Sequence, residues 1–409
     1  MRPCLAAPAP PAFALHDGDT VVFYGASIVE QRLFGRDIET FTQTRLPRMH
    51  VRFINSGWSG DSVSGGGGGP IDLRLTRDVV NYKPTVVTIL LGTNDGGYKP
   101  YDEARFQAYA RGVTHIVDTL TRALPHARLT LMTPSFFDYG ARTRPARPAT
   151  VDGYNFSNPA PDYNQTLVRY GDFVKKLGAE RHLTVVDENA PLAAATKAGR
   201  RVDSGFALSP DGVHPNELGH LIMAAALLTA WHAPLMPSVW LSPGNAKAKV
   251  WPLPWPLPAE ARAGLRFAPQ AMLLEEWPVT LLDRKPLPHS LVVLVDGRPV
   301  GTATIKQAAG GIDLTQYPAL PANKQAQRVL ALVQQRTETW HDFWKGRVGL
   351  AHANDIPTDD ELSKLRAEDA RLDALRTEAH EAAQPVAHTL SVRPVAAAQN
   401  QAAPDSQTP

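Results

Sequence analysis

An aspartate and a histidine three residues apart are the pair in this sequence best suited to acid–base chemistry. Asp211 and His214 lie on a short glycine-containing stretch ahead of a proline and an apolar run. A serine hydroxyl becomes a nucleophile when an imidazole takes its proton, and a carboxylate on the other ring nitrogen fixes the tautomer. One tight turn can supply that contact. The alternative is a helix-entry loop whose polar side chains only cap the helix.

Ser27 is the candidate nucleophile for this pair. It follows the apolar run Val21–Ala26, at the point where a parallel sheet presents its ligands. Gly57 and Asn94 also follow apolar runs, and their N–H groups are suited to stabilising an oxyanion. Taken singly, the serine fits a helix cap and the other two fit turn residues. In this order, ahead of the aspartate and the histidine, they predict a serine hydrolase.

Alternating strands and helices must position these residues. The strand candidates are mostly continuous apolar runs, as expected for strands covered on both faces, at Thr20–Tyr24, Val51–Asn55, Thr85–Leu91, Arg128–Thr133 and Leu183–Asp187. Apolar spacing predicts helices over 106–120, from about Asp162, and over 216–231. Strand and helix in turn imply a parallel α/β sandwich.

The four candidate blocks resemble those of the SGNH (GDSL-type) hydrolase family. The matching stretches are Tyr24–Ile28, Asn55–Gly60, Leu91–Asp95 and Asp211–Pro215. The resemblance implies a flavodoxin-like three-layer α/β/α sandwich with a parallel sheet. It also implies the site residues: Ser27 as nucleophile, His214 as base, Asp211 as its partner, and an oxyanion hole made by Gly57, Asn94 and the Ser27 amide. The implied reaction is hydrolysis of carboxylic esters through an acyl-serine intermediate, without a cofactor.

One position departs from the pattern of that family. The family usually has an aspartate before the nucleophilic serine, and hydrogen bonds of that aspartate help hold the block together, whereas this chain has Ala26. A second serine, Ser62, follows Gly60-Asp61 and matches the short motif better. It runs into the glycine run Gly65–Gly69, so we assign it to a loop. No Lys-Ser/Thr pair follows those glycines, which favours a flexible loop over a phosphate site.

Acetyl esters of carbohydrates or polysaccharides are the substrates that the resemblance favours. Trp58, Asp95 and Tyr98 lie beside the blocks and are candidate substrate-binding residues. Two alternatives stay open: a lipase or lysophospholipase-like esterase on lipid or aryl esters, and an inactive hydrolase scaffold that binds carbohydrate, since Ala26 replaces the aspartate. His214 and His220 do not follow a metal-ligand pattern, so no metal is predicted.

The composition argues against several classes of protein. The 409 residues carry a net charge of +2, without the basic stripe of a nucleic-acid-binding protein. No run of 18 apolar residues predicts a transmembrane segment. Cys4 is the only cysteine, so no intramolecular disulfide is possible. The small residues near the N-terminus fit a truncated signal peptide of a periplasmic or secreted protein, or a disordered leader of a cytoplasmic one.

Changes in composition predict the domain boundaries. We expect a flexible leader at 1–12, the hydrolase domain at 13–235, an α+β accessory region at 236–350, a polar helix at 351–383 and a disordered tail at 384–409. The accessory region combines a proline-rich connector, a β-hairpin turning at Asp296-Gly297 and a helix from about Ala322. Thr358 and Glu361 have the spacing of a capping box at the start of the polar helix.

Overall fold

The computed structural model describes most of the chain. The described residues are 12–143, 150–151, 154–155, 159–234, 239–241, 246–249, 271–274, 290–305, 307, 312–313, 317–349, 358–384 and 386–395. The chain forms two compact units. The first unit combines residues 1–235, 257–268 and 327–384, and the second combines residues 236–256, 269–326 and 385–409.

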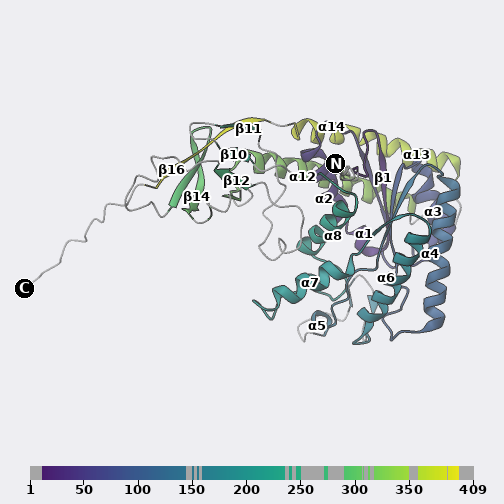
Figure 1. The fold of residues 1–409 in the computed structure, drawn as a ribbon. Coiled ribbons are helices and arrows are strands. Elements are labelled where there is room, and N and C mark those ends of the chain that lie inside the picture. The colour runs from purple at the N-terminus through teal and green to yellow at the C-terminus, as the bar shows by residue number, and fades with distance from the viewer. Residues whose placement is uncertain are drawn as a thin grey trace, which may run out of the picture. The chain divides into compact units, whose positions relative to one another are not determined.

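A five-stranded parallel sheet lies at the centre of the first unit (Figure 1). Its strands are β1 (Thr20–Gly25), β2 (Arg52–Gly57), β5 (Val86–Leu90), β6 (Arg128–Met132) and β9 (Thr184–Val186). They lie in the order β2-β1-β5-β6-β9, and all neighbouring pairs are parallel. The five predicted strands are confirmed. Because the chain leaves β1 and β5 in opposite directions along the sheet, the carboxyl edge beside them is where such folds bind ligands.

Helices cover both faces of this sheet (Figure 1). They are α1 (Ser27–Glu30), α2 (Leu33–Arg45), α3 (Ile71–Asp78), the short 3₁₀ helix η1 (Val80–Tyr82), α4 (Glu103–Ala123), α5 (Tyr139–Arg142), α6 (Tyr163–Glu180), α7 (Asn189–Gly199) and α8 (Glu217–Ala230). Val22 and Tyr24 pack with residues of α4 and α6, whereas Val21 and Phe23 pack with residues of α2 and α8. Alternate side chains of one strand thus point to opposite faces. The predicted three-layer α/β/α sandwich is confirmed.

Two small hairpins lie in the loops of this unit. One pairs β3 (Gly65–Gly66) with β4 (Gly69–Pro70), and the other pairs β7 (Thr150–Val151) with β8 (Tyr154–Asn155). The glycine run was predicted to be a flexible loop, but it forms the first hairpin and packs on buried side chains. A Cβ atom on Gly68 would lie 2.8 Å from atoms of both Trp58 and Arg74, so only glycine fits there.

The C-terminal helices extend the first unit beyond the predicted boundary. They are α12 (Pro321–Phe343), the following π-helical turn η3 (Trp344–Gly349), α13 (Asp359–Arg371) and α14 (Asp373–Ala382). From Gln327 onward they belong to the unit of the large sheet, whereas the sequence placed the helix from Ala322 in a separate accessory region. Trp340, Trp344 and Leu365 are buried in the same apolar cluster as Tyr24 and Ile54. The predicted capping box of Thr358 and Glu361 is present at the start of α13.

The second unit contains two small sheets. One has the order β10-β12-β15, from β10 (Val239–Leu241), β12 (Ala271–Leu274) and β15 (Ile312–Asp313). The other has the order β11-β16-β13-β14, from β11 (Ala246–Lys249), β16 (Ala387–Pro394), β13 (Ser290–Val295) and β14 (Arg298–Thr304). β13 and β14 form the predicted hairpin, and both Asp296 and Gly297 have positive φ.

The tail was predicted to be disordered from 384, but residues 387–394 form β16 and pair with β13. The predicted leader at 1–12, most of the proline-rich connector and the tail beyond 395 lie outside the described residues. None of the helices in the described part has the length and apolar composition that a bilayer-spanning segment needs.

Candidate active site

Ser27 is the first residue of α1, directly after β1 reaches the carboxyl edge of the sheet. The turn is tight: a Cβ atom on Gly25 would overlap the carbonyl oxygen of Leu90 on the neighbouring strand. The backbone N–H of Glu30 then donates to the carbonyl of Ala26 at 3.0 Å. Ala26 is at the N-cap position of this helix and provides no side-chain cap. The serine is therefore positioned by backbone geometry.

Asp211, His214 and Ser27 form a continuous hydrogen-bonded chain. His214 Nε2 lies 2.8 Å from Ser27 Oγ, and its Nδ1 lies 2.6 Å from Asp211 Oδ2. The other carboxylate oxygen of Asp211 accepts the backbone N–H groups of Val213 at 2.8 Å and His214 at 2.6 Å. Burial raises the pKa of Asp211, but the hydrogen bonds and charge of His214 outweigh it and hold that pKa below its ordinary value. An ionised carboxylate thus fixes the imidazole tautomer with Nε2 facing the serine hydroxyl.

Gly212 explains how the aspartate and the histidine fit on one turn. Its φ is +82°, in the region that favours glycine, and an added Cβ would lie 2.7 Å from Arg142 Cβ. Asn216 caps the next helix, α8, by accepting the N–H of Gly219 at 3.0 Å. This cap fixes the start of α8 directly after the histidine loop.

Gly57 ends β2 beside Gly25, its partner in the parallel register. A Cβ atom on Gly57 would overlap the backbone nitrogen of Glu30, so the backbones of the second block and of α1 are in direct contact. The Gly57 N–H donates to Asn55 Oδ1 at 3.2 Å. To stabilise an oxyanion, the Gly57 N–H must donate to both acceptors at once or exchange Asn55 Oδ1 for the substrate oxygen.

Asn94 has both ends of its side-chain amide fixed. Its Nδ2 donates to the carbonyl oxygen of Asp61 at 2.9 Å, and its Oδ1 accepts the hydroxyl of Tyr98 at 3.0 Å. These partners define which end of the amide is the nitrogen. Because Nδ2 carries two hydrogens, one is left to donate to a ligand.

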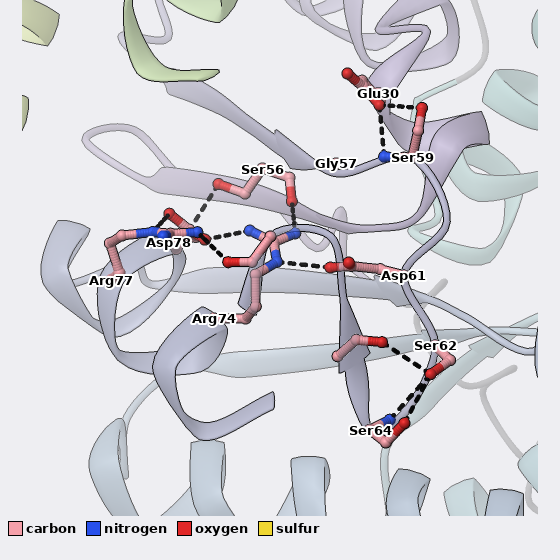
Figure 2. Close-up of polar contacts among 12 residues, drawn as sticks. Glu30, Ser56, Gly57, Ser59, Asp61, Ser62, Ser64, Arg74, Arg77 and Asp78 are labelled. Atoms are coloured by element: carbon pink, nitrogen blue, oxygen red, sulfur yellow. Dashed lines mark hydrogen bonds and ion pairs between the residues drawn. The ribbon is translucent and has the colours of Figure 1, made fainter. Parts of the chain in front are cut away.

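A buried ionic cluster supports the loop that contacts Asn94 (Figure 2). The guanidinium of Arg74 is fully buried and donates to Asp61 Oδ2 at 2.6 Å, to Asp78 and to the carbonyl of Ser56 at 2.9 Å. Arg77 donates to the same Asp78 at 2.8 Å. Trp344 Nε1 also donates to Asp78, at 2.8 Å. The loop from Gly57 to Asp61 therefore rests on paired charges rather than on a plain apolar core.

The three predicted substrate-binding residues have other surroundings. Trp58 is 3% exposed, and Arg74 Cζ lies 5.6 Å from the centroid of its indole ring. This tryptophan therefore does not line the site. Asp95 accepts the N–H of Val63 at 2.9 Å, and burial raises its pKa to about 6. Tyr98 holds Asn94, as described above. Ser62 donates to the carbonyl of Gly65 at 2.9 Å and lies in the loop that leads into β3.

A cavity of about 660 Å³ opens beside Ser27 and His214. Apart from two prolines, its remaining lining is polar or charged: Glu30, Gln31, Arg32, Ser59, Asp211, Asn216 and Lys345. The sequence did not point to Glu30 or Lys345. Glu30 could have been found from the sequence, because it follows Ser27 by three residues and so lies one helical turn away. No feature of the sequence indicates Lys345. In the described part of the chain, no group of three or more His, Cys, Asp or Glu side chains is placed to hold a metal ion.

Comparisons with known proteins place this fold among ester hydrolases. Residues 23–222 match the family model of the GDSL-like lipase/acylhydrolase family. The chain is 27% identical over 196 residues to an acetylxylan esterase of Geobacillus stearothermophilus, covering 46% of this chain and 74% of that relative. A solved structure of a gut microbial diltiazem-metabolizing enzyme is 21% identical, with a TM-score of 0.70 over 94% of this chain and 99% of the other. That second likeness concerns the fold, and it extends well beyond residues 23–222.

Proposed function

Because the chain belongs, over residues 23–222, to the GDSL-like lipase/acylhydrolase family of carboxylic ester hydrolases, we propose that Ser27 is its nucleophile. The observation that carries this proposal is the chain of hydrogen bonds from Ser27 through His214 to Asp211. A serine, an imidazole and a carboxylate in this arrangement are the requirements for acyl transfer to serine.

The reaction follows from the positions of the protons. His214 Nε2 takes the hydroxyl proton as Ser27 Oγ bonds to the ester carbonyl carbon, and Asp211 stabilises the imidazolium. The oxyanion takes hydrogen bonds from the Asn94 amide and from backbone N–H groups of Gly57 and Ser27. As the tetrahedral adduct collapses, the imidazolium protonates the leaving alcohol. Water then attacks the acyl carbon with His214 again as base. The second adduct collapses as the bond to Ser27 Oγ breaks, the imidazolium returns a proton to that oxygen, and the acid leaves.

We infer that the alcohol part of the substrate is rich in hydroxyl groups, as in an acetylated carbohydrate. The cavity beside Ser27 offers amide, hydroxyl, carboxylate and cationic groups but, among the described residues, no large apolar side chain. Such a lining suits hydrogen bonding to a sugar better than burial of a long acyl chain. The likeness to an acetylxylan esterase supports the same substrate class.

Two measurements test this function. A serine-directed phosphonate is expected to label Ser27, and Ser27→Ala is expected to lower kcat by at least about 10⁴-fold on p-nitrophenyl acetate. Ser62→Ala is the matched control and should keep both labelling and turnover. Failure of the phosphonate to label Ser27 would instead favour an inactive scaffold. Acetylated xylo-oligosaccharides should turn over faster than long-chain lipid esters; the reverse order would favour a lipase.

A further inference from the structure

The end of α12 and the turn η3 contact the candidate site through the carboxylate of Glu30. Glu30 ends α1, three residues after Ser27, and is 8% exposed. Its Oε1 accepts His341 Nε2 at 3.0 Å and Lys345 Nζ. Both donors come from the end of α12 and the following turn, outside the residues that match the family. Lys345 also lines the cavity beside Ser27.

The other oxygen of the same carboxylate holds the loop after Gly57. Glu30 Oε2 accepts the backbone N–H of Ser59 at 2.5 Å and also its hydroxyl (Figure 2). Ser59 follows Gly57, the predicted oxyanion donor, by two residues. The Gly57 backbone also touches that of Glu30. The carboxylate of Glu30 therefore links helix α1, which carries Ser27, to the loop that follows Gly57.

This contact differs from an ordinary surface ion pair. Burial raises the pKa of Glu30, but hydrogen bonds from His341, Lys345 and Ser59 outweigh it and lower that pKa to about 2. Lys345 is held on its other side by Trp58, with Nζ 5.3 Å from the ring centroid. Arg32 Nη1 donates to the backbone carbonyl of Glu30 at 2.6 Å, so the main chain at this residue is fixed as well. A partly buried carboxylate with this many fixed donors has one preferred position.

We propose that Glu30 is a positioning residue for ester hydrolysis and that His341 and Lys345 hold it in place from the C-terminal helix. The proposal rests on the acyl-serine function given above. Its physical content is that Ser27 and the Gly57 amide must keep a fixed separation while the oxyanion forms. Small losses of alignment between a nucleophile and its oxyanion donors lower the rate of the chemical step, with little effect on ground-state binding.

The test compares Lys345→Met, Lys345→Arg and Glu30→Gln in the full-length protein. With p-nitrophenyl acetate and with an acetylated xylo-oligosaccharide, Lys345→Met and Glu30→Gln are expected to lower kcat about tenfold while KM stays within about twofold. Lys345→Arg keeps the charge and should recover most of the kcat. Lys364→Met is the matched control, because Lys364 is an exposed lysine on α13 whose Nζ pairs with Asp360 at 2.6 Å. Its kinetics should equal those of the wild type.

Several outcomes would overturn the proposal. One is an unchanged kcat in Lys345→Met and Glu30→Gln. Another is a rise in KM for the oligosaccharide alone, which would mean that Lys345 contacts the substrate. The third is a loss of activity that is caused by unfolding at the assay temperature, which thermal melts of the variants detect. If Ser27→Ala abolishes turnover but Lys345→Met does not reduce it, this proposal fails and the proposed function stands.

Discussion

In the proposed reaction, the side chain of Asn94 is oriented before the oxyanion forms. Tyr98 fixes its oxygen and Asp61 takes one of its two amide hydrogens, so the other hydrogen has a defined direction. A donor that is already oriented needs no reorganisation when charge develops on the substrate oxygen. We therefore propose that Tyr98, predicted from the sequence as a substrate-binding residue, acts on the reaction by orienting Asn94.

This arrangement predicts a graded loss of catalysis. Asn94→Ala is expected to lower kcat by about 10²- to 10³-fold with little change in KM, because the lost hydrogen bond forms with the oxyanion. Tyr98→Phe keeps the ring and loses only the hydroxyl, so a smaller fall, about tenfold, is expected. Steady-state kinetics on p-nitrophenyl acetate measure both, with Ser62→Ala as control. A Tyr98→Phe variant with wild-type kcat would show that Asn94 is held by other contacts.

At this scale the sequence located residues well where their partners are local. Asp211 and His214 are three residues apart, so their contact needed no knowledge of the fold. The burial of Trp58 could not be predicted in this way, because it depends on Arg74 and on Trp344, which is remote in sequence. In the sequence, an aromatic residue beside a candidate block looks the same whether its side chain lines the site or is buried.

Among the elements, α2 has an unusual composition for its position. Its polar residues include Arg36, Glu39, Thr40 and Thr44, all buried. Its apolar residues Phe34, Ile38 and Phe41 have helical spacing and are buried together, but this helix was not predicted. Helix α2 packs mainly on α8 and also contacts α14, which is remote in sequence. Strands β1 and β5 were predictable because their own apolar residues carry the signal.

Helix α8 carries a buried histidine that predicts a pH dependence of stability. Burial and the nearby charge of Arg36 lower the pKa of His220 from 6.5 to about 3. Its Nδ1 accepts the N–H of Phe34 at 3.3 Å, and its Nε2 lies 3.0 Å from Gln31 Oε1. The folded state binds this proton less well than the unfolded state. The contribution of neutral His220 to the free energy of unfolding is therefore complete above about pH 6.5. It is lost as the pH falls toward about 3.

Replacing this histidine should therefore flatten the acid side of the stability curve. The free energy of unfolding, measured by denaturant titration between pH 7 and 4, is expected to fall less steeply with acid in His220→Gln than in the wild type. Glutamine can still hydrogen-bond to Phe34 or Gln31 and does not titrate. Parallel curves for His220→Gln and wild type would contradict the assignment.

For the molecule as a whole, the outer edge of the large sheet is closed by a segment remote in sequence. Strand β2 is at the edge, and α12 supplies donors to its free carbonyl groups: Arg336 Nη1 to Phe53 at 3.1 Å and Trp340 Nε1 to Asn55 at 3.2 Å. Arg336 also pairs with the buried Glu39 of α2. An uncovered edge strand is open to pairing with other chains. The C-terminal helices are thus part of the hydrolase unit.

This closure predicts that a chain ending at Leu235 will not form a stable, active enzyme, although it contains the whole stretch that matches the family. Loss of Trp340 and Trp344 removes about 3–5 kcal/mol each, and a folded domain has only about 5–15 kcal/mol in total. Glu39 would also lose its buried cation, and β2 its edge cover. Size-exclusion chromatography, near-ultraviolet circular dichroism and esterase assays should show an aggregated or loosely packed, inactive product. A soluble product with cooperative unfolding and wild-type kcat would show that the sheet and the oxyanion loop hold their positions without these helices.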